Sequence, residues 1–403
     1  MGLSIQKFGG TSVADADRIR EVADHIARSS KTDQVVVVVS AMGKTTDNLI
    51  RLSKDVSNIH PGRELDMLLT AGERISMALL CMALADLGIK AASFTGSQAG
   101  IITDTTHTKA KILEIKPDRI HAALKNGIVP VVAGFQGVST DNNITTLGRG
   151  GSDTTAVALA AALGADRCEI YTDVSGVFSA DPRVVPESKK LKHVSFEEML
   201  EIAATGGKVL ALRSVEFARN HKVVLEVRSS FTWEPGTLVS EESKDMEQPI
   251  VSAVTSDTSS AKLTIAGVPD QPGIAASLFR GLAEKAINVD MIVQNVSQDG
   301  TTDISFTVPR ADVETAVNVA SQIAPVLGAG NVSIDENVAQ VSLIGAGMKT
   351  NPGVTATMFE ELAKLGINIE MISTSPIRIS CMVQADQSEN AVRALHKAFG
   401  LDQ

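Results

Sequence analysis

The chain has 403 residues, a length that suits two or three domains, each large enough to bury its own core. Its formal net charge is −10, which disfavours nucleic acid and anionic membrane surfaces as partners because both attract a basic face. The cysteines, Cys81, Cys168 and Cys381, are far apart and form no C-x-x-C pair. We therefore expect no zinc site, no disulfide and a cytoplasmic location. No apolar run approaches the ~18 residues of a membrane span.

Strand-like and helical segments alternate from residue 1 to about residue 240. Runs rich in Val and Ile at 34–40, 128–135 and 168–174 are apolar on both faces, which is typical of a parallel sheet covered by helices. We predict an α/β fold with an open, mainly parallel sheet between helix layers. Ligands are expected at the carboxyl ends of its strands.

Apolar periodicity predicts two helices in this region. One follows Ser12, has hydroxyl groups at its N-cap and buries a stripe that includes Ile19, Val22 and Ile26. The other is long, largely apolar and expected to run without a break from residue 63 to residue 87.

The first strand ends in the sequence KFGGTS, from Lys7 to Ser12. Its two glycines let backbone N–H groups approach a ligand, and Lys7 can neutralise charge on a transferred phosphoryl group. This pattern favours a polyphosphate site, although a plain strand and turn with an exposed lysine has the same residues. The nearby Gly43-Lys44-Thr45 is not part of a P-loop, because Val38 occupies the position of the first glycine.

A second glycine-rich turn, TTLGRGGSDTT from Thr145, precedes an Ala-rich helix over about 154–163. Arg149 offers a guanidinium to a carboxylate or phosphate, and Asp153 could align Lys7. Equally, Arg149 could be a solvated side chain and Asp153 a helix cap. In the long helix, Glu73 is a carboxylate among apolar residues and needs a partner, such as the amine of a ligand.

Candidates for a nucleotide site follow the predicted strand at 168–174. Thr172 and Asp173 lie at its end, and a loop with charges of both signs runs from residue 177 to residue 183. Lys208 follows two glycines. A solvated surface turn is the alternative interpretation of these segments.

An internal repeat follows the charged sequence EESKDMEQ, which predicts a linker at 241–248. INVDMI at 287–292 recurs as INIEMI at 367–372, and Pro-Gly at 272–273 recurs at 352–353, both at an offset of 80 residues. Each copy has the pattern of a βαββαβ unit, with one strand expected over 288–296 in the first copy. The chain ends before the last strand of the second copy, so we predict that 249–256 folds back to complete it. The predicted domains are 1–240, then 262–336, then 249–256 together with 338–403.

Motifs along the whole chain closely resemble those of bacterial aspartate kinases. They are KFGGTS, SAMGKTTD, TAGERIS, VAGFQG, TTLGRGGSDTT, YTDVSGVFSADPR and SFEEMLE, in the order of that family, and the C-terminal pair resembles ACT domains. The resemblance implies an amino-acid-kinase fold and ATP-dependent phosphorylation of the side-chain carboxylate of L-aspartate to 4-phospho-L-aspartate. This is the first step toward lysine, threonine, methionine and diaminopimelate. Mg²⁺ is implied as a companion of ATP, with no side-chain motif of its own.

By the same resemblance, three groups of residues have implied roles in catalysis. The catalytic pair is Lys7 with Asp153, which would organise that lysine. The ATP-binding residues would be Lys7, Phe8, Gly9, Gly10, Thr172, Asp173, Phe178, Asp181, Pro182, Arg183 and Lys208. The aspartate-binding residues would be Ser40, Thr45, Thr46, Glu73, Arg149, Gly150, Gly151 and Ser152, with Glu73 on the amino group and Arg149 on a carboxylate.

The ACT resemblance implies feedback regulation by lysine, threonine or both, in a homodimer formed through these domains. The matching positions are Asp270, Gly273, Ile274, Ala275, Gln294 and Asn295 in the first copy, and Thr355, Asn368, Glu370, Ser373 and Thr374 in the second. Pro376 stands where the family pattern has an acidic residue, and Gly207 replaces a usual serine. Met246 resembles the internal start from which some relatives make a regulatory subunit, which would give an α₂β₂ assembly.

Two other functions remain open at this stage. A kinase of the same class could act on glutamate, acetylglutamate or a nucleotide, and a protein that only binds amino acids could have lost catalysis. The tandem ACT pair argues against the first alternative, and the presence of Lys7, Arg149 and Asp153 argues against the second.

Overall fold

The computed structural model describes residues 2–241, 250–295 and 300–402. It divides into two compact units. One consists of Met1–Val177, Lys190–Ala203 and Lys208–Met246, and the other of Phe178–Lys189, Ala204–Gly207 and Glu247–Gln403. The linker predicted at 241–248 lies almost wholly outside the described residues. Each unit is considered by itself.

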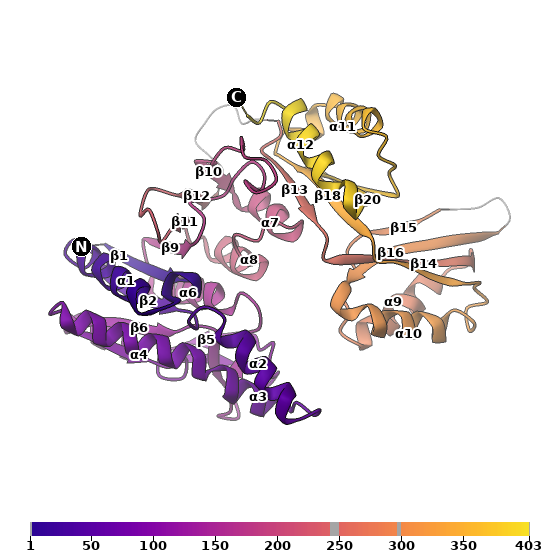
Figure 1. Ribbon diagram of the computed structural model, residues 1–403. Coiled ribbons are helices and arrows are strands. Elements are labelled where there is room, and N and C mark those ends of the chain that lie inside the picture. Colours follow the sequence, from indigo (N-terminus) through magenta and orange to yellow (C-terminus); the bar gives the residue numbers. More distant parts are fainter. Residues whose placement is uncertain (1, 242–249, 296–299, 403) are drawn as a thin grey trace. The chain divides into compact units, whose positions relative to one another are not determined.

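The first unit is built on an eight-stranded sheet with the order β10-β12-β11-β9-β1-β2-β6-β3, in which only the β11/β12 pair is antiparallel (Figure 1). Its strands are β1 (Leu3–Phe8), β2 (Gln34–Val39), β3 (Ala91–Phe94), β6 (Val129–Ala133), β9 (Arg167–Thr172), β10 (His193–Ser195), β11 (Leu225–Ser229) and β12 (Thr237–Ser240). A smaller sheet contains β5 (Ile112–Ile115), β4 (Ile101–Thr103), β7 (Gln136–Ser139) and β8 (Ile144–Thr146). The predicted open, mainly parallel sheet is thereby confirmed.

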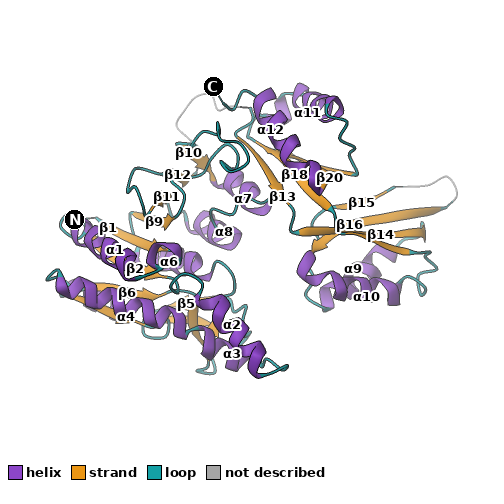
Figure 2. Ribbon diagram, viewed as in Figure 1, coloured by secondary structure: helices purple, strands orange, loops and turns teal. Residues whose placement is uncertain are grey.

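Helices cover both faces of the large sheet (Figure 2). The helices of this unit are α1 (Ala16–Ser29), α2 (Thr45–Val56), α3 (Gly62–Leu69), α4 (Ala71–Asp86), α5 (Asp118–Lys125), α6 (Gly151–Leu163), α7 (Phe196–Ala204) and α8 (Leu212–His221). Of these, α3 contacts β8 of the smaller sheet. On one face, alternate valines of β2 pack with α1 and α4 in one buried cluster. On the other face, α6 contacts β1, β2 and β9 and buries ten consecutive residues from Gly151. Burial on both faces explains why these strands have no polar alternation.

Two local predictions for this unit are wrong. The helix after Ser12 begins at Ala16, because Asp15 and not a hydroxyl caps it and accepts a hydrogen bond from Arg18 N at 2.9 Å. The long helix predicted over 63–87 is interrupted at Thr70, which separates α3 from α4. The carbonyl of Thr70 accepts a hydrogen bond from the side chain of Gln136 at 3.3 Å. This contact joins segments that are distant in sequence, so apolar periodicity could not predict the break.

The segment Gly62–Asp86 is long and apolar enough to cross a membrane on length and composition alone. However, 44% of its most apolar window is buried inside the protein, and the segment is broken at Thr70. A helix in the interior of a protein passes the same test of length and composition.

The second unit contains two four-stranded antiparallel sheets of the same design. The first copy has the sheet order β15-β16-β14-β17, and the second has β19-β20-β18-β13. Their elements are β14 (Ser260–Pro269), α9 (Ile274–Glu284), β15 (Ile292–Gln294), β16 (Thr301–Pro309), α10 (Val313–Ile323) and β17 (Val332–Asp335), then β18 (Val338–Ile344), α11 (Gly353–Lys364), β19 (Met371–Ser375), β20 (Arg378–Gln384) and α12 (Ser388–Ala398). The βαββαβ order of the first copy is as predicted, except that β15 is shorter than the strand expected over 288–296.

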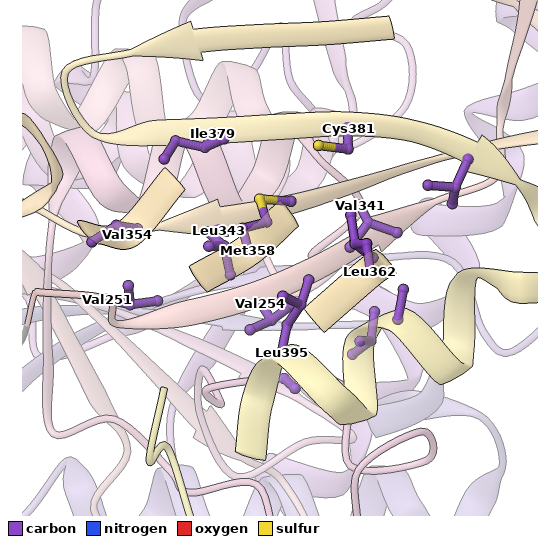
Figure 3. Packing of buried hydrophobic residues seen from close by; sticks show 14 of the residues in the cluster. Val251, Val254, Val341, Leu343, Val354, Met358, Leu362, Ile379, Cys381 and Leu395 are labelled. Atoms are coloured by element: carbon purple, nitrogen blue, oxygen red, sulfur yellow. The ribbon is translucent and has the colours of Figure 1, made fainter. Parts of the chain in front are cut away.

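The strand β13 (Ala253–Asp257) precedes the first copy in sequence but lies at the edge of the sheet of the second copy. It pairs antiparallel with β18, with Val254 opposite Leu343, and so occupies the place that β17 has in the first copy. Val251 and Val254 belong to the same buried cluster as Leu343, Met358 and Leu395 (Figure 3). A strand from before the first copy therefore contributes to the core of the second.

We predict that Val254→Asp loosens the second copy alone. Val254 is fully buried, and burying a charge without a partner is strongly destabilising. Hydrogen exchange should lose protection in β18 and β20 while β14 and β16 keep theirs. Leu263→Asp, at a fully buried position of the first copy, is the matched control and should give the reverse pattern. Equal loss in both sheets after Val254→Asp would contradict this role of β13.

Candidate active site

Lys7 and Asp153 form a buried ion pair in the first unit. Lys7 lies near the end of β1, and Asp153 lies in the first turn of α6. The Nζ atom of Lys7 is 2.5 Å from Oδ1 of Asp153, a contact that lacks hydrogen-bond geometry, and each residue is 8% exposed. Because α6 packs directly on β1, the carboxylate holds the ammonium group at the carboxyl edge of the sheet.

The two glycines after β1 keep the backbone next to Lys7 closely packed. Gly9 N donates to the carbonyl of Tyr171 at 3.1 Å, and Gly43 N donates to the carbonyl of Gly10 at 3.0 Å. A Cβ atom at Gly10 would lie 3.0 Å from the carbonyl oxygen of Ala41, closer than most Cβ contacts, so a side chain here would push on the segment after β2. The ends of β1, β2 and β9 therefore meet here, as expected for a ligand site at the carboxyl ends of parallel strands.

Glu73 reaches the end of the neighbouring strand β2 from the first turn of α4. It is 3% exposed, and Ala41 N donates to its Oε1 at 3.3 Å. Its Oε2 is buried and accepts no hydrogen bond from the residues that the structure describes. Burial raises the pKa of Glu73 from 4.5 to about 7. The ionised form of such a carboxylate is stabilised strongly by a cation that binds the oxygen without a hydrogen bond.

The contact between α4 and the segment after β2 requires small side chains. A Cβ atom at Gly72 would lie 2.7 Å from the Cβ of Ala41. The hydroxyl of Ser76 donates to the carbonyl of Ser40 at 2.6 Å. Thr45 donates to the carbonyl of Met42 at 2.6 Å, and Thr46 follows it in the first turn of α2. The predicted residues Ser40, Thr45, Thr46 and Glu73 thus lie along one stretch of the site.

The turn that carries Arg149 lies between β8 and α6. Gly148 and Gly150 have φ values of 79° and 71°, a region that favours glycine. Arg149 between them is exposed. A Cβ atom at Gly134, which follows β6, would lie 2.7 Å from Oγ of Ser152. Ser152 and Asp153 therefore lie at the same edge of the sheet as Lys7. Arg149 lies in the turn that leads into them, with its side chain exposed.

Among the residues predicted to bind the nucleotide, Thr172 and Asp173 lie at the end of β9, beside the end of β1. Asp173 and Lys208 are exposed. Phe8 is fully buried and stacks on Tyr171 at a centroid distance of 4.8 Å. Any contact of Phe8 with a ligand is therefore limited to its backbone.

Phe178, Asp181, Pro182 and Arg183 belong to the second unit. Their segment packs on the second copy of the repeat: Val254 N donates to the carbonyl of Ser179 at 2.8 Å, and Oγ of Ser179 lies 2.9 Å from Nε2 of His396. Ala180 and Val185 are part of the buried cluster of that copy. The domain predicted over 1–240 includes these residues, whereas here they group with the second unit. Their role at the nucleotide, which the resemblance implies, stays a prediction.

The predicted effector residues lie in the second unit. In the first copy, Asp270 and Gly273 precede α9 and are exposed, and Gln294 and Asn295 are exposed at the end of β15. In the second copy, Glu370 already has partners, since Lys262 forms an ion pair with its carboxylate and the amide of Gln384 donates to it. An effector that uses Glu370 would have to share it with these groups.

Sequence reasoning missed residues that support the site. The backbone N–H of Ala41 holds Glu73, as described above. Arg213 on α8 donates to the carbonyls of Leu147 and Ala110, each at 2.9 Å, and so supports the turn of Arg149. In the sequence, an isolated arginine gives no indication of such a role.

Comparison with known proteins identifies the family. A model described as the amino acid kinase family matches residues 3–229, and an ACT domain model matches residues 263–323 and 341–399. The aspartokinase of Mycobacterium tuberculosis is 57% identical over 407 residues, which cover 100% of this chain and 97% of the relative.

Two solved structures of Escherichia coli aspartokinase III are similar throughout. The complex with aspartate and ADP, called the R-state, has a TM-score of 0.85 at 25% identity, covering 98% of this chain and 99% of that one. The complex with lysine and aspartate, called the T-state, has a TM-score of 0.76 at 26% identity with the same coverage.

The sheet, the lysine near the end of its first strand and the family match together define a kinase that carries two C-terminal ACT domains. Within the amino acid kinase family, the chain belongs to the aspartokinases. The resemblance seen in the sequence motifs is thereby confirmed.

Proposed function

We propose that this site transfers the γ-phosphoryl group of ATP to the side-chain carboxylate of L-aspartate, forming 4-phospho-L-aspartate and ADP. The observation that carries the choice of substrate is Glu73, a buried carboxylate with one oxygen that accepts no hydrogen bond from the described residues. It lies at the end of β2, the strand next to the one that carries Lys7. It suits the ammonium group of an amino acid. Arg149 is an exposed guanidinium in the turn just before α6, the helix that carries Asp153, and suits a carboxylate. Ser40, Thr45, Thr46, Gly150, Gly151 and Ser152 complete the proposed aspartate site.

The chain's residues act on this reaction by positioning and by charge. The side-chain carboxylate of aspartate is already ionised near neutral pH, so its attack on phosphorus needs no general base. An oxygen–phosphorus bond to aspartate forms while the bond from phosphorus to the leaving ADP oxygen breaks. Lys7 neutralises charge on the transferred group, and Asp153 keeps the ammonium of Lys7 in place.

The residues present fit a triphosphate. Lys7 supplies a cation at the end of β1, and the two glycines that follow it carry no side chain that would block a phosphate. The N–H of Gly9 already donates to the carbonyl of Tyr171, so it is not free to donate to a phosphate. Thr172, Asp173 and Lys208 are the proposed nucleotide contacts of the same unit. The described residues contain no group of three or more His, Cys, Asp or Glu side chains that could hold a metal. Mg²⁺, carried with ATP, would screen phosphate charge.

Release of ADP from ATP with a panel of acidic amino acids tests this function. Turnover on aspartate, and not on glutamate or acetylglutamate, is the expected result. Turnover on another acceptor would identify a different kinase of the same family. Binding of amino acids without ADP release under any condition would identify a protein that only senses them.

We further propose feedback regulation through the ACT domains by lysine, threonine or both. Adding the two amino acids singly and together to the ADP assay tests this. The segment Phe178–Lys189, which carries four predicted nucleotide contacts, packs in the core of the second copy. We therefore expect an effector to raise the KM for ATP. Unchanged kinetics with both amino acids would contradict this regulation.

The assembly we propose is a cytoplasmic homodimer through the ACT domains, or an α₂β₂ complex if translation also starts at Met246. Met246 lies outside the described residues. The cysteines are free, which suits a reducing compartment. A blot of native cells with an antibody against the C-terminus distinguishes the two assemblies, because full-length protein alone would exclude α₂β₂.

A further inference from the structure

Asp66 is a buried carboxylate to which the proposed reaction gives no role. It lies on α3 and is 0% exposed. Its oxygens accept hydrogen bonds from Nδ1 of His107 at 2.7 Å, from N of Thr108 at 3.1 Å and from Oγ1 of Thr146 at 2.5 Å. A carboxylate buried to this extent is tolerated only when donors surround it. The identity of those donors therefore shows what Asp66 holds together.

The donors come from two segments that flank the turn of Arg149 in space. One is the end of β8, which leads into the turn, and the other is the loop at 107–108, which packs against it. Thr146 ends β8, three residues before Arg149. Thr108 has a φ of 66°, a conformation that a β-branched residue rarely adopts. Its N–H is held by Asp66, and its carbonyl oxygen would lie 3.2 Å from a Cβ atom at Gly148. Asp66 thus fixes both the start of the turn and the loop that packs against it.

The helix of Asp66 leads directly to Glu73. Thr70 N donates to the carbonyl of Asp66 at 3.1 Å, and α4 begins at the next residue, with Glu73 in its first turn. One side chain therefore ties the helix pair that carries Glu73 to the turn that carries Arg149. These two residues are the ones proposed to hold the amino and carboxylate groups of the substrate.

We propose that Asp66 is a positioning residue that sets the separation between Glu73 and Arg149 and thereby adapts the site to an amino acid. This inference rests on the proposed function. Asp66 contacts no reacting atom; it acts through its bond to Thr146. Misplacing a binding group by about 1 Å can cost on the order of 10²-fold in rate. The loss should fall on the amino acid substrate and leave the nucleotide unaffected. Asp153, which holds Lys7, is on α6, and that helix is anchored by its own buried contacts with β1, β2 and β9.

Thr146→Val tests the proposal, since it removes the hydroxyl that Asp66 binds but keeps the branched shape. We expect the KM for aspartate to rise by about tenfold or more, while the KM for ATP changes by less than about twofold. Thr146→Ser keeps the hydroxyl and should therefore have a KM for aspartate close to that of the wild type. Asp66→Asn, which removes the charge but keeps one acceptor, should give the same selective effect and carries the test if Thr146→Val fails to fold.

Thr145→Val is the matched control. Thr145 is also fully buried, and its hydroxyl lies 2.6 Å from that of Thr103, away from Asp66. We expect a similar loss of stability from both valine variants but a change in the KM for aspartate from Thr146→Val alone. Equal changes from both, or equal changes in the KM for ATP and for aspartate, would overturn the proposal. If the wild type accepts a different amino acid, the proposed function fails, and the same variants are compared on that substrate.

Discussion

Replacing Lys7 with glutamine should lower kcat by about 10²–10³-fold, which corresponds to about 3–4 kcal/mol of lost transition-state stabilisation. The Nζ atom of Lys7 is the cation that Asp153 holds at the end of β1. Glutamine has a similar length but no charge, so it cannot neutralise charge that develops on the transferred phosphoryl group. The measurement is steady-state ADP release at saturating ATP and aspartate.

A second variant separates this loss from damage to the fold. Lys7→Gln leaves Asp153 buried without its cation, which costs stability. The double variant Lys7→Gln/Asp153→Asn removes that lone charge and should be at least as stable as the single variant, yet equally inactive. Trp233 is the chain's single tryptophan and stacks on His25 at 4.1 Å in the first unit, so its fluorescence reports unfolding of this unit. Recovery of activity in the double variant would show that Lys7 is structural.

The large sheet and α1 could be predicted because the apolar pattern within a segment indicates which of its faces are buried. This pattern is visible without knowledge of distant residues, in the valines on both faces of β2 and in the stripe of Ile19, Val22 and Ile26 on α1. The break at Thr70 could not be predicted, because Gln136, the residue that binds its carbonyl, is distant in sequence. The same holds for the segment Phe178–Lys189, which follows a strand of the first unit but is buried with residues near the C-terminus.

The same distinction applies to the site: residues whose local context is unusual could be predicted, and those whose partners are distant in sequence could not. Lys7, Glu73 and Arg149 are predictable as site residues because a charge beside glycines or within an apolar helix requires a partner. Asp66 meets the same criterion, as a carboxylate within the apolar run LDMLL, but its donors come from residues 107, 108 and 146. A carboxylate bound by distant donors and one that awaits a ligand look alike in a sequence. Only the structure distinguishes the saturated Asp66 from Glu73, which has an open oxygen.

Glu73→Gln should lower kcat/KM for aspartate by about 10²-fold, because truncating one partner of a buried charge pair costs about 2–5 kcal/mol.

The pH dependence of kcat/KM in the wild type should reflect the ionisation of Glu73. Glu73 must be ionised to bind an ammonium group, and burial raises its pKa from 4.5 to about 7 in the free protein. The kcat/KM for aspartate should therefore fall about tenfold per pH unit below about pH 7. Glu73→Gln should remove this dependence.

The stability of the first unit should move in the opposite direction. Between pH 4.5 and about 7 the folded state keeps a proton on Glu73 that the unfolded state has released. The free energy of unfolding therefore falls as pH rises through this range, by about 3 kcal/mol at most.

Glu73→Gln carries no such penalty, so it should raise the unfolding midpoint measured by Trp233 fluorescence at pH 8 but not at pH 4. A variant that loses both aspartate binding and stability at pH 8 would show that Glu73 supports the fold. A variant that loses binding and gains stability would show that its charge is held in place for the substrate.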